Sequence, residues 1–233
     1  MMPKIIFEDS AILVIDKPSG WIVNNAATAK GQPIVQTWLF DNFDYPIVKD
    51  ARLRSGIVHR LDKETSGVLI IAKNQKAMEN LQSQFKSRVV KKEYVALVHG
   101  KLELKTGSVE TPVGRLPWNR KRFGVLAGGR EAKTSWEVEK YYKKGEEAFS
   151  LVTLFPATGR THQIRIHLKY LSHPVVSDEF YAGRKTARAD RKWCPRLFLH
   201  AAKLNLLHPE DKNPVSFFSS LPVDLKKALS KLS

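Results

Sequence analysis

The chain has 233 residues, 42% of them hydrophobic, which is enough to bury a substantial core and excludes a disordered protein. Lys and Arg number 39 against 23 Asp and Glu, a formal net charge of +16, so we expect a polyanionic partner, nucleic acid before membrane. Apolar runs are too short for a bilayer span, no secretory stretch opens the chain, and the one cysteine excludes an intrachain disulfide. These features predict a soluble, cytoplasmic protein.

The first part of the chain predicts a hairpin, a short helix and a buried strand. Short β-like runs at 5–8 and 11–16 lie either side of Asp-Ser, which predicts the hairpin. Residues 34–43 predict the short helix. The continuous apolar run 68–72 is typical of a buried strand.

The clearest predicted helix follows Asn74, a suitable N-cap. Its apolar positions at helical spacing are Met78, Leu81, Phe85 and Val89. Residues 93–99 then predict a strand that ends at Gly100. Residues 101–130, rich in Gly, Pro and cations, indicate loops or β-ribbons.

The second half predicts another hairpin, from strands at 134–141 and 148–155. Residues 160–171 predict a helix with Ile164, Leu168 and Leu171 on one stripe. A strand is expected at 198–207, and a C-terminal helix from Pro222 through Leu232.

Hairpins with a few inserted helices predict an α+β fold rather than a doubly wound α/β fold. No repeat, low-complexity tract or long linker interrupts residues 1–233. One continuous domain is therefore the expected organisation.

The polar loop between Gly56 and Gly67 is the first candidate for chemistry, because a loop tethered to a buried strand is rigidly mounted. Asp62 is its candidate reactive carboxylate. The alternative is that Asp62 only bonds nearby backbone in a turn.

Arg165 and Tyr94 each have a structural and a functional interpretation. Arg165 is expected at the rim of a core, where it would form either an ordinary salt bridge or a pair with Asp62 that keeps the carboxylate ionised. Tyr94 begins a strand and is either a core residue or a platform under a nucleobase with its phenol available for proton transfer.

Two clusters of cations, 115–122 and 184–192, are either solvated loops or sites of RNA contact. Aromatic residues in or beside them, Trp118, Phe123, Tyr181 and Trp193, favour phosphate contact with base stacking. The expected RNA-binding residues are His59, Arg60, Arg115, Arg120, Lys121, Arg122, Arg160, Thr161, His162, Arg188, Arg191 and Lys192.

Metal and nucleotide chemistry lack sequence support. The histidines form no His-Glu-x-x-His pair, and a single cysteine cannot build a zinc knuckle. There is also no phosphate-binding loop and no dinucleotide fingerprint. We expect no metal and no cofactor.

Three motifs resemble those of the RluA family of RNA pseudouridine synthases. His-Arg-Leu-Asp-Lys-Glu-Thr-Ser-Gly at 59–67 resembles the family signature, 92–100 its tyrosine strand and 156–167 its third motif. The similarity continues through 173–178 and 199–201, covering nearly the whole chain.

The resemblance implies a single catalytic domain with a mixed, mainly antiparallel sheet flanked by helices and loops, an RNA-binding cleft across the sheet, and no cofactor. It implies Asp62 as nucleophile, Tyr94 beside the target uracil, Arg165 as the salt-bridge partner of Asp62, and Arg60 in the space left by the flipped base. The S4 RNA-binding domain of many relatives is expected to be absent.

The predicted function is therefore isomerisation of specific uridines in an rRNA or tRNA stem-loop, by a protein expected to be monomeric. The residues leave open whether Asp62 attacks C6, attacks C1′ or assists a glycal route. Two other classes also remain open: a non-catalytic RNA-binding module, and a metal-independent ribonuclease using His59 and His167.

Overall fold

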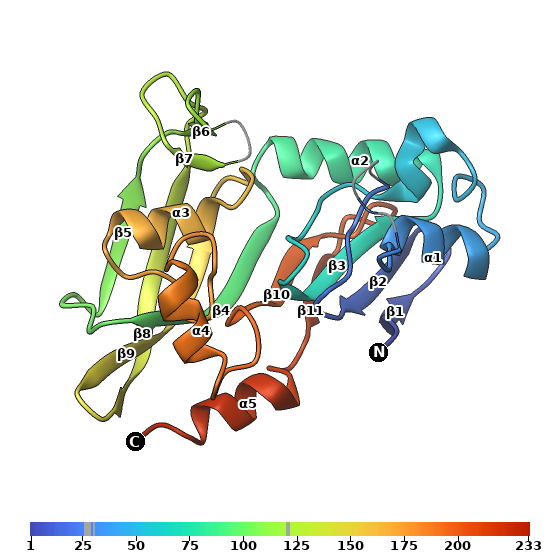
Figure 1. Cartoon of the computed structure of the whole chain (residues 1–233). Helices are drawn as coiled ribbons and strands as arrows, with labels where there is room; N and C mark the ends of the chain where they lie inside the picture. The colour runs from blue at the N-terminus through green and yellow to red at the C-terminus, as the bar shows by residue number, and fades with distance from the viewer. Residues whose placement is uncertain (26–28, 30, 120–121) are drawn as a thin grey trace. The chain divides into compact units, whose positions relative to one another are not determined.

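The computed structural model describes residues 1–25, 29, 31–119 and 122–233, and these divide into two compact units (Figure 1). Unit 1 comprises Met1–Lys92 and Ala201–Ser220; unit 2 comprises Glu93–His200 and Leu221–Ser233. Two of the crossings between units fall inside strands, β4 (Lys91–His99) and β10 (Leu199–Leu207).

Unit 1 contains strands in the order β1-β2-β3-β10, with β11 paired to β10. In addition to β10, the strands of unit 1 are β1 (Lys4–Glu8), β2 (Ile12–Lys17), β3 (Ser66–Ala72) and β11 (Pro214–Phe218). The pairs β1–β2, β2–β3 and β10–β11 are antiparallel. The predicted hairpin and buried strand are confirmed, and every residue of β3 is buried. Strand β11 was not predicted, because it has only five residues and begins with proline.

The helices of unit 1 are α1 (Val35–Asn42), the 3₁₀ segment η1 (Ala51–Gly56) and α2 (Gln75–Lys86), which packs on β3. Asn74 caps α2 as predicted, its Oδ1 accepting from the Ala77 N–H at 2.9 Å. The inclusion of Val89 in this helix was wrong. Arg88 takes a left-handed φ of 62°, and the Arg88 and Val89 N–H groups bond back to Phe85 and Gln84, a Schellman ending. Val89 is consequently 41% exposed.

Unit 2 contains strands in the order β4-β9-β8-β5, with antiparallel pairing throughout this series. In addition to β4, the strands of this series are β5 (Thr106–Glu110), β8 (Lys133–Lys144) and β9 (Glu147–Pro156). The hairpin β8–β9 was predicted and is longer than expected. A separate two-stranded ribbon, β6 (Val113–Arg115) with β7 (Phe123–Val125), agrees with the expectation of β-ribbons over 101–130.

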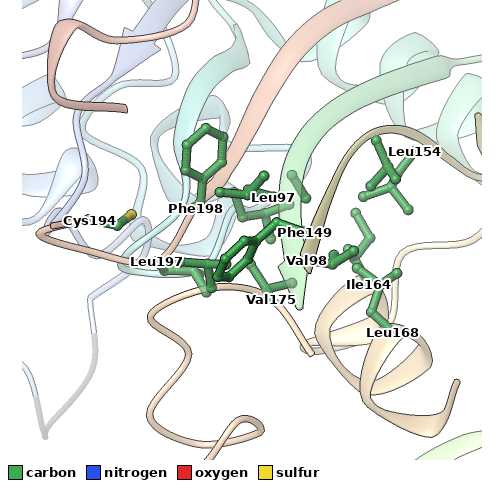
Figure 2. Packing of buried hydrophobic residues seen from close by; sticks show 14 of the residues in the cluster. Leu97, Val98, Phe149, Leu154, Ile164, Leu168, Val175, Cys194, Leu197 and Phe198 are labelled. Atoms are coloured by element: carbon green, nitrogen blue, oxygen red, sulfur yellow. The ribbon is translucent and has the colours of Figure 1, made fainter. Parts of the chain in front are cut away.

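The helices of unit 2 are α3 (Gln163–Tyr170), α4 (Arg184–Asp190) and α5 (Val223–Leu229). α3 begins three residues later than predicted because His162 is left-handed, with φ of 55°. α5 ends before Leu232. Figure 2 shows the core between α3 and strands β4 and β9, where Ile164 and Leu168 pack near Val98 and Leu154.

The fold is α+β with a mainly antiparallel arrangement, as predicted. One continuous catalytic domain, the absence of an S4 domain and an RNA-binding cleft stay predictions. Within the part of the chain that is described, no helix is both long and apolar enough to cross a bilayer.

Candidate active site

Glycines at both ends of the Asp62 loop are required by the packing of unit 1. Gly56 has φ of 79°, and a Cβ there would lie 1.9 Å from the Ala72 carbonyl oxygen. Gly67 has φ of 119°, and a Cβ there would lie 2.1 Å from the Ala201 carbonyl oxygen. Both positions therefore exclude any side chain, and they fix where the loop leaves and enters the sheet.

The backbone just after Asp62 is held by the turn that follows β2. Lys17 is fully buried, and its Nζ donates to the carbonyls of Pro18 and Trp21 at 3.0 Å and of Lys63 at 3.3 Å. The Gly20 N–H donates to the same Lys63 carbonyl at 2.8 Å. The Ser19 hydroxyl donates to the Glu64 carbonyl at 2.8 Å. Three donor groups thus make five hydrogen bonds, three to the Lys63 and Glu64 carbonyls beside Asp62 and two within the turn itself. The carboxylate is half-buried.

His59, at the start of the loop, is a neutral packing residue. Its ring stacks on Phe85 of α2 with centroids 4.8 Å apart, and its Nε2 accepts from the Ile70 N–H at 3.1 Å. Burial, with a smaller contribution from Lys92, lowers the pKa of His59 to about 3. Its proposed RNA contact stays a prediction.

Arg165 on α3 is buried rather than at a rim, with its side chain 5% exposed. Its Nε and Nη2 donate to the two oxygens of Asp178 at 2.7 and 2.8 Å. The guanidinium also lies over the rings of Phe180 and Tyr181, 5.7 and 5.0 Å from their centroids. Because Asp178 takes the Nε–Nη2 edge, a further acceptor must approach from Nη1 or from the second N–H of Nη2. The pair between Asp62 and Arg165 stays a prediction.

Asp178 is itself fully buried and held by backbone. The Phe180 and Tyr181 N–H groups donate to its Oδ1 at 3.0 and 3.1 Å. Sequence reasoning noted Ser177-Asp178 only within the resemblance and missed this role, as it missed Lys17. Charged residues are normally exposed, so a buried one gives little sequence signal.

Tyr94 lies on β4, half-buried against the core of unit 2 and opposite Leu154 of β9. This supports its packing role. Its stacking beside a uracil stays a prediction.

The third motif forms a hydrogen-bonded corner. The Tyr181 hydroxyl lies 2.9 Å from His162 Nδ1 and 3.2 Å from the Phe123 carbonyl, so it bridges the two. The Arg160 Nε donates to the Glu131 carbonyl at 3.0 Å. Thr161 and Arg60 are half-buried and exposed respectively.

The aromatic residues predicted to stack on bases differ in how far their side chains are exposed. Trp118 is 76% exposed. Trp193 is 7% exposed and packs edge-on against Phe149 at 5.4 Å, so its assignment to an RNA surface was wrong. Phe123 and Tyr181 are half-buried and already bonded within the corner described above.

The predicted basic clusters are exposed where they are described. On the ribbon, Arg115 lies 4.7 Å from the Phe123 ring centroid and Arg122 is exposed; Arg120 and Lys121 lie outside the described residues. On and after α4, Arg188, Arg191 and Lys192 are exposed, and Arg191 pairs with Glu179 at 3.4 Å. Their RNA contacts stay predictions.

The geometry does not favour the ribonuclease alternative. His167 is fully buried; its Nε2 lies 3.2 Å from the Thr111 carbonyl and its Nδ1 2.9 Å from the Thr134 hydroxyl. Burial lowers the pKa of His167, as it does for His59. Neither ring is therefore suited to acid-base exchange with a substrate. Among the described residues, no group of three or more His, Cys, Asp or Glu could hold a metal ion.

Comparisons with known proteins give one consistent answer. A family model described as RNA pseudouridylate synthase matches residues 11–170. An uncharacterized RNA pseudouridine synthase of Mycoplasma genitalium is 34% identical over 230 residues, covering 99% of this chain and 70% of that protein. A ribosomal large subunit pseudouridine synthase D of Nitrosomonas europaea is 39% identical over 235 residues, covering 98% of this chain and 65% of that protein. The corresponding protein of Xanthomonas campestris is 34% identical over 237 residues, covering 98% and 69%.

Solved structures of similar fold carry the same family description. The human RNA pseudouridylate synthase domain containing 1 protein has a TM-score of 0.69 and 26% identity, covering 94% of this chain and 83% of that one. The human domain containing 4 protein has the same fold, with a TM-score of 0.71 at 24% identity, over 98% and 93% of the two chains. The resemblance of the three motifs to the RluA family is thereby supported along the chain, and this chain belongs to the RNA pseudouridine synthase family of isomerases.

Proposed function

We propose that Asp62 is the catalytic carboxylate with which this enzyme converts uridine to pseudouridine. The reaction breaks the N1–C1′ bond, turns the base, joins C5 to C1′ and releases the C5 hydrogen as a proton. A target inside a helix must first be flipped out. A carboxylate can act as a covalent nucleophile in this sequence. Attack at C6, attack at C1′ and proton removal toward a glycal all require the same ionised group.

The observation that carries the proposal is the bracing of the Asp62 loop. Hydrogen bonds from Lys17, Ser19 and Gly20 hold the backbone of the next two residues, while the Asp62 side chain is left half-buried rather than enclosed. A turn whose aspartate only satisfied local backbone would not need this support. Preorganised mounting is what a nucleophile requires.

Arg165 and Tyr94 complete the proposed site. Arg165 would donate from its Nη1–Nη2 end to the Asp62 carboxylate and favour its ionised form. Tyr94 would stack beside the uracil and accept the C5 proton. Arg60, exposed in the same loop, would occupy the space left by the flipped base.

We further propose that the substrate is ribosomal RNA of the large subunit rather than tRNA, because two of the relatives above are named for that activity. The enzyme would act as a cytoplasmic monomer without a nucleotide cofactor.

The test of Asp62 is Asp62→Asn, assayed by tritium release from [5-³H]uridine RNA. We expect turnover to disappear while RNA affinity is kept, because the amide is isosteric and uncharged. Undiminished tritium release would contradict the assignment. The same RNA run on a denaturing gel should keep its length, whereas a ribonuclease would shorten it.

The substrate is tested by mapping pseudouridine in total RNA from cells with and without the gene. Loss of sites only in tRNA would contradict the ribosomal assignment. Loss of no site in any RNA would leave only the non-catalytic RNA-binding module.

A further inference from the structure

A cluster of cations follows helix α2 in unit 1, outside the basic clusters that the sequence analysis singled out. Residues 80–92 contain four Lys and Arg and no Asp or Glu. Three of the four, Lys86, Arg88 and Lys91, are exposed, and we call them the α2-end cluster.

The turn that presents this cluster is ordered by backbone. Arg88 occupies the left-handed position of the Schellman ending, where glycine is usual and a larger residue is strained. The Lys91 Nζ donates to the Arg88 carbonyl at 3.2 Å. The turn therefore fixes the positions from which the exposed Arg88 and Lys91 side chains leave the backbone.

The α2-end cluster differs from the α4 cluster in its acidic neighbours. Arg184 and Arg191, at the ends of α4, pair with Glu179 at 3.8 and 3.4 Å. Over the described residues, the three cations of the α2-end cluster have no carboxylate within ion-pair distance. Cations that have no nearby carboxylate in the protein gain the most electrostatic stabilisation from an external anion.

The cluster adjoins the Asp62 loop within the same unit. Phe85, the residue before Lys86, stacks on His59 at the start of that loop, and Lys92 is close enough to lower the pKa of His59. Two exposed cations, Arg60 and Lys63, lie on the loop itself. Positive charge thus extends from either side of Asp62 toward the end of α2.

We propose that the α2-end cluster binds the phosphates of the RNA strand that flanks the target uridine. This inference rests on the proposed function, because it takes Asp62 as the point where the uridine sits. Phosphate contacts of this kind fix the register of the strand without reading its sequence. Lys86 alone could be explained by the negative end of the α2 dipole, but Arg88 and Lys91 lie beyond the helix.

The test is the triple variant Lys86→Gln, Arg88→Gln and Lys91→Gln. Its matched control is Lys144→Gln, Lys226→Gln and Lys227→Gln, which removes the same charge from exposed lysines of unit 2. Affinity for a short fluorescein-labelled RNA stem-loop with uridines in its loop is measured over a series of salt concentrations. Circular dichroism and the urea midpoint check that both variants fold.

We expect the α2-end variant to bind about tenfold more weakly at low salt, and the slope of log affinity against log salt to fall by about 2 to 3, one phosphate contact per residue. The KM for tritium release should rise while turnover at saturating RNA is unchanged. Equal slopes and affinities for the two variants would overturn the proposal. If the wild-type protein released no tritium from any RNA, the proposed function would fail, while the salt slope would still report on the cluster.

Discussion

The loop that carries Asp62 and the helix that carries Arg165 are braced in opposite ways. In unit 1 a buried ammonium, Lys17, holds the loop through backbone carbonyls. In unit 2 a buried carboxylate, Asp178, holds Arg165 through its side chain. Backbone bracing leaves the side chains it supports free to vary. Side-chain bracing depends on the identity of both partners.

The difference also changes the electrostatics of the proposed site. Asp178 already balances the charge of Arg165, so the guanidinium would act on Asp62 as an oriented donor as much as a source of positive charge. The Asp62 loop, by contrast, carries exposed Lys63 and Arg60. Lys63 and Arg60 would therefore add to the effect of Arg165 in favouring the ionised form of Asp62.

Removing the Asp178 side chain that holds Arg165 should have the largest effect on the free energy of unfolding. Asp178→Ala leaves Arg165 as a buried charge without its bidentate partner, which typically costs about 3–5 kcal/mol of unfolding free energy. We expect a loss in this range by urea denaturation, together with reduced tritium release per folded molecule.

The double variant Arg165→Met with Asp178→Leu separates these two effects. Replacing both charges by apolar groups should restore most of the stability, while turnover should be lost because the proposed catalytic arginine is gone. If Asp178→Ala kept both stability and turnover, the pair would have no bracing role.

Removing the Lys17 hydrogen bonds to backbone carbonyls should lower the free energy of unfolding by a smaller amount. Lys17→Met keeps the apolar stem but removes the donor to three carbonyls, for which we expect a loss of about 2–3 kcal/mol. Turnover at saturating RNA should fall because the Asp62 loop loosens, whereas KM should hold because the exposed cations remain.

Lys73→Met is the matched control for Lys17. Lys73 follows the opposite end of β3, is 17% exposed and pairs with Glu8 at 2.8 Å. Its replacement should lower stability without changing turnover per folded molecule. Equal loss of turnover in the two variants would show a general effect of the sheet rather than bracing of the loop.

Sequence patterns predicted the elements whose signal is local. The apolar run of β3 and the cap and spacing of α2 depend on neighbouring residues, and both were confirmed. The prediction that Val89 belongs to α2 was wrong, because a Schellman turn at Arg88 ends the helix although the apolar periodicity continues.

The candidate site was predicted less completely, for a physical reason. Motifs predicted Asp62, Tyr94 and Arg165 as site residues, and this stays a prediction. Sequence proximity to cations placed Trp193 on the surface, whereas its side chain enters the core. The supports, Lys17 and Asp178, are charged residues whose partners at the site, the Lys63 carbonyl and Arg165, lie 46 and 13 positions away in sequence. No local pattern distinguishes them from the exposed charges that surround them.

At neutral pH the smallest predicted effect on stability concerns His59, which lies at the start of the Asp62 loop and stacks on Phe85. The pKa of His59 is about 3 when folded, against an ordinary value of 6.5, mainly because of burial and secondarily because of Lys92. Between these pH values the unfolded chain binds a proton that the folded protein does not. Stability should therefore fall as pH drops below the ordinary value, by up to about 1.4 kcal/mol per pH unit from this residue.

His59→Gln should remove this contribution and flatten the dependence of unfolding free energy on pH in that window. Phe85→Ala opens the ring to water and Lys92→Gln removes a neighbouring charge, so both should raise the pKa of His59 in an NMR titration. The shift should be larger for Phe85→Ala, because burial is the larger cause. A wild-type titration midpoint near the ordinary histidine value would instead mean that the ring is solvated, and that the loop above it lacks the packed support inferred from its stacking on Phe85.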